Sequence, residues 1–129
     1  QAAEFIDSMK DGYDSMISQG GINVSGGQKQ RLSIARALVG KPEIYVFDDS
    51  FSALDFKTDA KLRAALKKET AEATVVIVGQ RVATILDADR IIVLDDGEIA
   101  GMGTHHELYQ NCEVYREIVH SQLSEDEIA

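Results

Sequence analysis

The sequence has 129 residues and a formal net charge of −9, with 44% hydrophobic and 27% charged residues. This composition is typical of one modest globular domain, and its acidity disfavours a nucleic-acid partner, because phosphates bind basic residues. The one cysteine, Cys112, excludes an internal disulfide and fits a reducing compartment. No apolar run approaches the ~20 residues of a membrane-spanning helix, and the first residues lack the pattern of a signal peptide.

The N-terminal part of the chain is expected to hold two helices joined by a long loop. An amphipathic helix is predicted over residues 2–10, and a stretch rich in Gly, Ser and Asp follows it as far as Gly27. The second helix begins near Ser25 and repeats apolar residues at helical spacing. Gly40 is a suitable C-terminal cap, and Pro42 prevents the helix from continuing.

Short apolar runs that alternate with helical segments predict a parallel α/β sheet farther along the chain. Asp55 is a candidate cap for the first helix of this region, and Thr104 with Glu107 predicts a capping box. The expected elements are strands at 44–47, 74–78 and 91–94, helices at 56–71 and 82–86, a return strand at 98–103, and one or two helices ending near residue 122.

The candidate chemistry begins with an octet of residues from Val24 to Arg31, Val-Ser-Gly-Gly-Gln-Lys-Gln-Arg. Its two glycines allow the backbone to approach a ligand closely, and the hydroxyl of Ser25 lies beside them. Because a helix follows at once, its N-terminal amides and dipole favour an anion. Taken alone, a serine-capped helix after a flexible loop explains the octet equally well.

Acidic and amide side chains follow the first two predicted strands. Asp48 and Asp49 end the first strand, and Gln80 comes soon after the second. In parallel α/β sheets, ligands bind at this end of the strands. One carboxylate there can hold Mg²⁺, directly or through water, and another can orient or deprotonate an attacking water. A strand followed by a polar turn gives the same local pattern without any function.

The order and spacing of these motifs resemble those of the ABC ATPase family, and the resemblance covers essentially the whole chain. The segment Val24–Gln28 resembles the signature motif, which is normally Leu-Ser-Gly-Gly-Gln, and Ile44–Asp48 resembles Walker B. The segment Ser52–Asp55 resembles the D-loop, and Gln80 stands at the position of the switch histidine. Residues 103–108 are similar to a stretch common near the end of exporter-type domains.

The resemblance implies the fold class and its subdivision. The expected fold is α/β, the C-terminal half of a P-loop NTPase-like (RecA-like) ABC ATPase core together with the signature-motif part of the helical subdomain. Residues 1 to about 40 would belong to the helical subdomain, and residues from about 41 to 123 would supply core strands and helices. The tail at 124–129 is expected to fray.

The resemblance also implies that two such domains pair head to tail and hold each ATP between them. The signature residues of this chain, Ser25, Gly26, Gly27 and Gln28, would then bind the nucleotide of the partner domain. In the family the partner domain is joined by transmembrane domains, so the segment is expected at the cytoplasmic face of the cell membrane.

The chain's own nucleotide would be served by a different set of residues. Asp48 is the implied Mg²⁺-associated carboxylate, Asp49 and Gln80 are the implied catalytic residues, and Asp55 of the D-loop is implied to contact nucleotide. Asp49 stands where the family has a catalytic Glu, and Gln80 stands where it has His. Asp is shorter by one methylene, and Gln does not titrate near neutral pH, so both changes are expected to weaken hydrolysis.

Paired changes of this kind resemble the degenerate subunit of a heterodimeric ABC exporter. A further departure is Gln19-Gly20-Gly21, where exporters often have Glu-Arg-Gly before the signature. The phosphate-binding Walker A pattern, Gly-x-x-x-x-Gly-Lys followed by Ser or Thr, is absent, since the only Gly-Lys, Gly40-Lys41, precedes a proline. The chain is therefore expected to be the second half of a domain, inactive by itself, and either prone to self-association or partly disordered.

The function expected from these residues is the ATP-binding and ATP-hydrolysing part of an ABC exporter, an ATPase coupled to transmembrane substrate export. One alternative is a non-transport ABC ATPase of the DNA-repair, chromosome-organising or translation type. Those proteins would be expected to have coiled coils or basic surfaces, which this sequence lacks. Another alternative is a regulatory module that binds ATP without turnover.

Overall fold

Side-chain caps set the start of the main helices in this chain. The computed structural model describes residues 1–123. The Ser25 hydroxyl accepts a hydrogen bond from the Gln28 N–H at 3.2 Å, while the Ser25 N–H donates to Gln28 Oε1 at 2.8 Å. Thr104 and Glu107 form the same reciprocal capping box at the start of another helix. These caps satisfy amides that have no partner within the helix.

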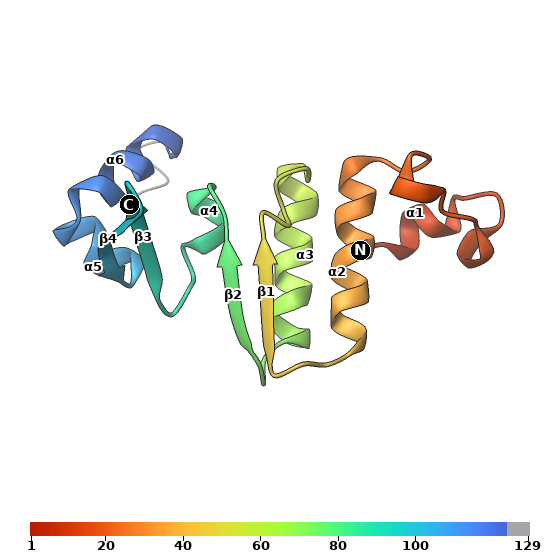
Figure 1. The fold of residues 1–129 in the computed structure, drawn as a ribbon, viewed down its shortest axis with the longest axis horizontal. Helices are drawn as coiled ribbons and strands as arrows, with labels where there is room; N and C mark the ends of the chain where they lie inside the picture. The colour runs from red at the N-terminus through yellow and green to blue at the C-terminus, as the bar shows by residue number, and fades with distance from the viewer. Residues whose placement is uncertain (124–129) are drawn as a thin grey trace. The chain divides into compact units, whose positions relative to one another are not determined.

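The described residues form two compact units, one over Gln1–Val78 and one from Gly79 onward. The first unit contains the following elements: α1 (Ala3–Asp7), η1 (Gly12–Asp14), η2 (Gln19–Gly21), α2 (Gly26–Val39), β1 (Ile44–Asp48), α3 (Phe56–Glu69) and β2 (Thr74–Val78). The second contains α4 (Val82–Ile85), β3 (Ile91–Asp95), β4 (Glu98–Gly103), α5 (His105–Asn111) and α6 (Glu113–Gln122) (Figure 1).

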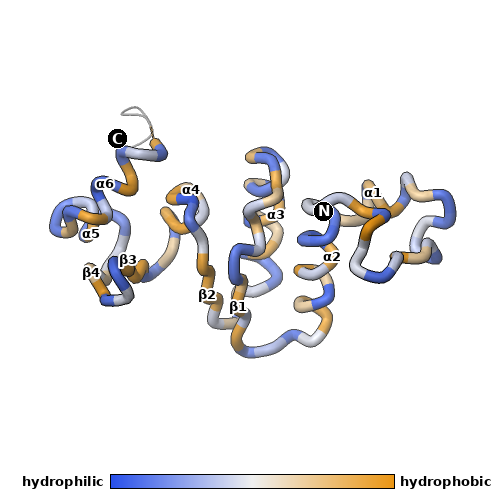
Figure 2. The backbone as a smooth tube through the Cα atoms, turned by 45° about the horizontal axis from the view of Figure 1, so that its top comes forward, coloured by the Kyte–Doolittle hydropathy of each residue, from blue (hydrophilic) through white to orange (hydrophobic). Residues whose placement is uncertain are grey.

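The first unit is built on the parallel pairing of β1 with β2, with α2 and α3 beside the strands (Figure 1). Alternate β1 side chains point to opposite faces, so Tyr45 and Phe47 are buried while Ile44 and Val46 are 61% and 65% exposed. The buried side chains of this core are Ile34, Tyr45, Phe47, Phe51, Leu54, Leu62 and Leu66. The helices therefore cover one face of the sheet, and the other face is bare. Figure 2 shows the hydrophobic stretches of both strands in orange.

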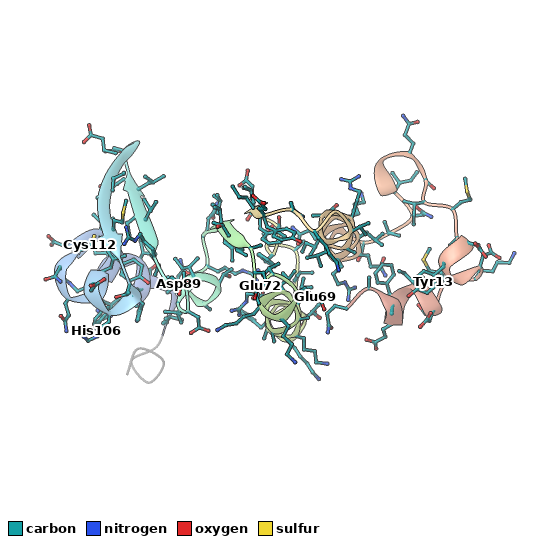
Figure 3. The ribbon with its side chains drawn as sticks, turned by 90° about the horizontal axis from the view of Figure 1, so that it is seen from below. Tyr13, Glu69, Glu72, Asp89, His106 and Cys112 are labelled. Carbon is teal, nitrogen blue, oxygen red and sulfur yellow. The ribbon has the colours of Figure 1, made fainter. Side chains whose placement is uncertain are left out.

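The second unit is a hairpin packed against α5 and α6. Strands β3 and β4 pair antiparallel through a turn at Asp96 and Gly97, both of which have positive φ, as a tight hairpin turn requires. Cys112, labelled in Figure 3, is buried in this unit. The buried core residues are Val82, Ile91, Val93, Leu108, Cys112, Tyr115 and Val119.

Most predicted elements are present, although several helices are shorter than predicted and two strands are one residue longer. The first helix covers Ala3–Asp7 rather than 2–10, and the helix expected over 56–71 ends at Glu69. The parallel sheet contains only β1 and β2 among the described residues, since the third predicted strand pairs antiparallel with β4. The subdivision near residue 40 stays a prediction, and the tail at 124–129 lies outside the described residues. Across residues 1–123, no helix has the length and apolar character needed to cross a membrane.

The bare face of the first sheet predicts that the 129-residue chain self-associates. Val46 and Val76 are cross-strand partners and are 65% and 44% exposed, and parallel sheets normally have both faces covered. Val46→Lys should reduce the associated fraction measured by light scattering. Val39→Lys, at an 83% exposed valine on α2, is the matched control and should leave association unchanged. A wild-type chain that stays monomeric as its concentration rises would contradict the prediction.

Candidate functional site

The carboxyl end of β1 carries the two predicted carboxylates. Asp48 is the last residue in register with β2, opposite Val78, and the Asp49 N–H donates to the Val78 carbonyl at 2.9 Å. Asp49 has a φ of 47°, in the left-handed region that Asp tolerates better than most residues. The chain therefore turns sharply at Asp49 while its backbone remains tied to the sheet.

The loop after β1 is bound to helix α2 by the side chain of Gln30. Gln30 Nε2 donates to the Asp49 carbonyl and to the Ser52 hydroxyl, both at 3.2 Å, and Gln30 Oε1 accepts from the Ala53 N–H at 3.1 Å. The Ser52 hydroxyl also donates to the Asp49 carbonyl, at 3.1 Å. The loop after Asp49 is thus hydrogen-bonded to α2, the helix that begins at Gly26.

The glycines at the start of α2 face this same loop. A Cβ added at Gly27 would lie 3.0 Å from the Ala53 carbonyl oxygen and 3.3 Å from a Leu54 methyl group. At Gly26 the nearest atom would be the Ala53 Cβ, at 3.6 Å, which is ordinary contact. Gly27 therefore has an intramolecular reason to be glycine, which the sequence prediction of a close approach to a ligand did not include.

Asp55 caps α3 with both of its carboxylate oxygens. Oδ1 accepts from the Thr58 N–H at 2.9 Å, and Oδ2 accepts from the Thr58 hydroxyl at 2.7 Å. These hydrogen bonds, the backbone one first, lower the pKa of Asp55 below its usual value. In this structure the side chain serves its own helix, and its predicted contact with nucleotide stays a prediction.

Gln80 belongs to the second unit, just before α4. Its carbonyl accepts a hydrogen bond from Gln122 Nε2 at 2.7 Å, and Gln122 Oε1 accepts from the Val82 N–H at 2.9 Å. The side chain of Gln122 thus attaches the segment before α4 to the end of α6. The catalytic role predicted for Gln80 stays a prediction.

The donor set at β1 is compatible with Mg²⁺. Within residues 1–123, neither the Asp48 nor the Asp49 carboxylate makes a hydrogen bond or ion pair with another side chain, so their oxygens remain available as ligands. No cluster of three or more His, Cys, Asp or Glu side chains suited to a metal occurs in that range. Mg²⁺ commonly uses one or two carboxylates and takes its other ligands from phosphate and water.

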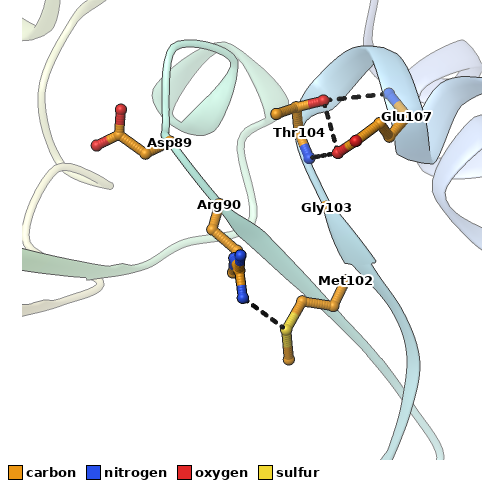
Figure 4. A pocket seen from close by; sticks show the side chains of 6 residues that line it. All are labelled: Asp89, Arg90, Met102, Gly103, Thr104 and Glu107. Carbon is orange, nitrogen blue, oxygen red and sulfur yellow. Dashed lines mark hydrogen bonds between the residues drawn. The ribbon is translucent and has the colours of Figure 1, made fainter.

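A pocket in the second unit lies apart from these motifs in the sequence. It has a volume of about 440 Å³ and is lined by Asp89, Arg90, Met102, Gly103, Thr104 and Glu107 (Figure 4). Thr104 and Glu107 are engaged with each other in the capping box, which lowers the pKa of Glu107. His105, near this pocket in the sequence, is hydrogen-bonded to the Tyr115 hydroxyl at 2.9 Å, which gives it a packing role.

Gln30 is the residue of this site that sequence reasoning overlooked. It was part of the octet, but only Ser25, Gly26, Gly27 and Gln28 received a role. The signal present in the sequence is a second glutamine, two residues beyond the Gln28 of the capping box. That pattern alone does not identify the loop it binds, because the loop lies about twenty residues farther along the chain.

The comparison with protein families agrees with this fold and motif order. The family model described as ABC transporter matches residues 1–52, which include the octet, β1 and both carboxylates. The chain has a mixed α/β fold that matches part of the ATP-binding domain of an ABC exporter of known structure.

Individual proteins are similar to this chain over most of its length. It is 51% identical to an ABC transporter ATP-binding protein of Mycobacterium tuberculosis over 112 residues, covering 87% of this chain and 19% of that protein. It is 43% identical over 110 residues to the leukotoxin translocation ATP-binding protein LktB of Mannheimia haemolytica, covering 85% of this chain and 16% of LktB. The solved structure of a bacterial Atm1-family ABC exporter with ATP bound matches with a TM-score of 0.87 and 36% identity, over 95% of this chain and 22% of that one.

Two of these similar proteins are named for translocation or export. The chain is similar to the ATP-binding parts of these proteins, and it spans about a fifth of the length of the curated relatives that it matches.

The contrast between the two glycines gives a direct test of the site's geometry. Gly26→Ala should stabilise the chain by about 0.5 kcal/mol, because alanine lowers the entropy of the unfolded chain and meets no close atom. Gly27→Ala should be less stable than Gly26→Ala by roughly 1 kcal/mol, because its methyl group meets the Ala53 carbonyl. Urea unfolding measures both free energies, and equal values would contradict the packing described for Gly27.

Proposed function

We propose that this chain is the second half of the ATP-binding domain in one subunit of a heterodimeric ABC exporter. The observation that carries the proposal is the arrangement in the first unit, where a Gly-rich helix start and a pair of available carboxylates are joined by one loop. The domain as a whole binds and hydrolyses ATP to drive export of a substrate across the membrane.

The start of α2 serves the ATP of a partner domain. The N-terminal amides of a helix carry partial positive charge and bind phosphate. The Ser25 oxygen accepts from the Gln28 N–H, which leaves the hydroxyl hydrogen of Ser25 for donation to a phosphate oxygen. Gly26 adds no side chain between the backbone and the ligand. Ser25, Gly26, Gly27 and Gln28 thus form a surface that a second domain completes from its own phosphate-binding loop.

The carboxylates serve this chain's own nucleotide. Asp48 would hold Mg²⁺, which neutralises phosphate charge when it is bound. Asp49 orients water poorly because its carboxylate is one methylene closer to the backbone than that of Glu. Gln80 can hydrogen-bond to a phosphate but cannot accept and release a proton near neutral pH. The chain's own site is therefore a weakly hydrolysing one, and the partner's site performs most turnover.

The proposed partners are a second ATP-binding domain, from a different chain, and the transmembrane domains of the exporter. The segment before the signature helix supports a protein partner, because Met16 and Ile22 are 85% and 84% exposed. Tyr13, labelled in Figure 3, is 74% exposed in the same segment. This exposed apolar surface supports the proposal that the segment contacts the membrane domains at the cytoplasmic side.

A second candidate function is ATP binding without turnover at this chain's own site. The observation that favours it is the left-handed backbone of Asp49, which favours a short side chain at the residue that the proposal assigns to the catalytic base. In that case the bound nucleotide closes the pair of domains and regulates the partner's hydrolysis. Turnover measured separately at the two sites of the assembled exporter distinguishes the candidates.

We expect the 129-residue chain alone to hydrolyse no ATP above background. The sequence contains no Walker A lysine and no amide cradle, which supply most phosphate contacts in P-loop enzymes. Phosphate release measured over a range of ATP concentrations tests this directly. Saturable turnover that disappears in Asp48→Ala would contradict it.

In the full exporter, Gly26→Asp should abolish most ATP turnover, whereas Asp49→Asn should change it little. An Asp at Gly26 adds negative charge beside the partner's phosphates, and a negative charge at a helix start preserves the fold. Gly27→Asp would confuse this effect with the contact to Ala53. Loss of a general base at a competent site costs about 10²- to 10⁴-fold. If Asp49→Asn lowers turnover as much as Gly26→Asp does, this site is an active one and the heterodimer proposal is wrong.

A further inference from the structure

The amide of Gln30 joins two segments that the proposed mechanism assigns to different nucleotides. Gln30 is on the second turn of α2, after the signature residues Ser25 to Gln28. Its side chain is half-buried and reaches the loop that begins at Asp49. The signature residues serve the partner's ATP, whereas the Asp49 loop serves the chain's own nucleotide. The side chain of Gln30 therefore links the helix that carries the signature residues to the loop that carries Asp49.

The hydrogen bonds use both ends of the amide. Nε2 donates to the Asp49 carbonyl and the Ser52 hydroxyl, and Oε1 accepts from the Ala53 N–H. An amide provides two N–H donors and one acceptor oxygen, so it meets these three partners in a single orientation. Among side chains of this length, Glu lacks the donors, Lys lacks the acceptor and Met lacks both.

The loop that is hydrogen-bonded to Gln30 also packs against Gly26 and Gly27. The Ala53 carbonyl would lie 3.0 Å from a Cβ at Gly27, so a shift of the loop changes the space beside the start of α2. The Asp49 carbonyl belongs to a residue with a φ of 47°, and a hydrogen bond to that carbonyl helps to hold the uncommon backbone conformation. The hydrogen bonds of Gln30 therefore affect both the space beside the start of α2 and the backbone conformation of Asp49.

We propose that Gln30 is a positioning residue for ATP turnover, which keeps the start of α2 and the 49–53 loop in one fixed arrangement. This inference rests on the proposed function. Gln30 itself does not touch the nucleotide. When its hydrogen bonds are lost, the signature residues and the carboxylate loop move relative to each other, and the site between the paired domains closes in a less productive geometry.

The test uses the full exporter, purified with its partner subunit and reconstituted in lipid nanodiscs. Gln30→Met keeps the length of the side chain and removes all of its hydrogen bonds, whereas Gln30→Glu keeps the acceptor for the Ala53 N–H. Gln110→Met is the matched control, because Gln110 is an exposed helical glutamine whose side chain, among residues 1–123, is hydrogen-bonded to His106 of its own helix. ATP turnover is measured against MgATP concentration, together with the thermal unfolding temperature.

We expect Gln30→Met to lower kcat about tenfold and to leave KM within about twofold, because small displacements reduce the rate more than the affinity. Gln30→Glu should have a kcat between those of Gln30→Met and wild type, and Gln110→Met should match wild type. A merely structural role would instead lower the unfolding temperature and the fraction of active protein without this order among the variants.

Two outcomes would overturn the inference in different ways. An active wild-type exporter whose kcat is unchanged by Gln30→Met would overturn the role of Gln30 and leave the proposed function standing. A wild-type exporter that does not turn over ATP would overturn the proposed function, and the role of Gln30 with it.

Discussion

The parallel register of β1 with β2 is the constraint on which the first unit depends. It aligns Ile44 with Thr74 and Asp48 with Val78, so the carboxylates emerge where the second strand also ends. The register is fixed by burial of Tyr45 and Phe47, since a shift of one residue would turn both aromatic rings away from the core and bring Ile44 and Val46 in. Packing in the core thus determines where the acidic loop begins.

From that point, the path of the chain is set by polar contacts. The Asp49 N–H extends the backbone hydrogen bonds of the sheet to the Val78 carbonyl. The loop then passes the start of α2, where it is hydrogen-bonded to Gln30 and packs closely against Gly27. Asp55 ends the loop by capping α3. The segment from Asp48 to Asp55 is therefore held at both ends and in its middle, and the proposed nucleotide contacts would be made by a loop whose backbone is already ordered.

The sequence predicted the helix caps and strands, which depend on residues close together in the chain. It did not predict the contact of Gln30, which depends on the path of a distant loop. Ser25 with Gln28 and Thr104 with Glu107 were readable as capping boxes because each pair is separated by three residues. The β-branched run at 74–78 was readable as a strand. The contact of Gln30 with Ala53 spans 23 residues and follows only from the fold. The predicted parallel pairing is confirmed for β1 and β2, and β3 pairs antiparallel with the predicted return strand β4.

The left-handed backbone at Asp49 limits how this site can change. Asp and Asn adopt a positive φ more readily than longer side chains do, because their short polar group can hydrogen-bond locally. A Glu at this position would gain reach toward a water molecule but would strain the turn that the Val78 and Gln30 hydrogen bonds enforce. A longer carboxylate would therefore have to be accommodated by the loop as well as by the residue, so the length of the acid and the shape of its turn are coupled.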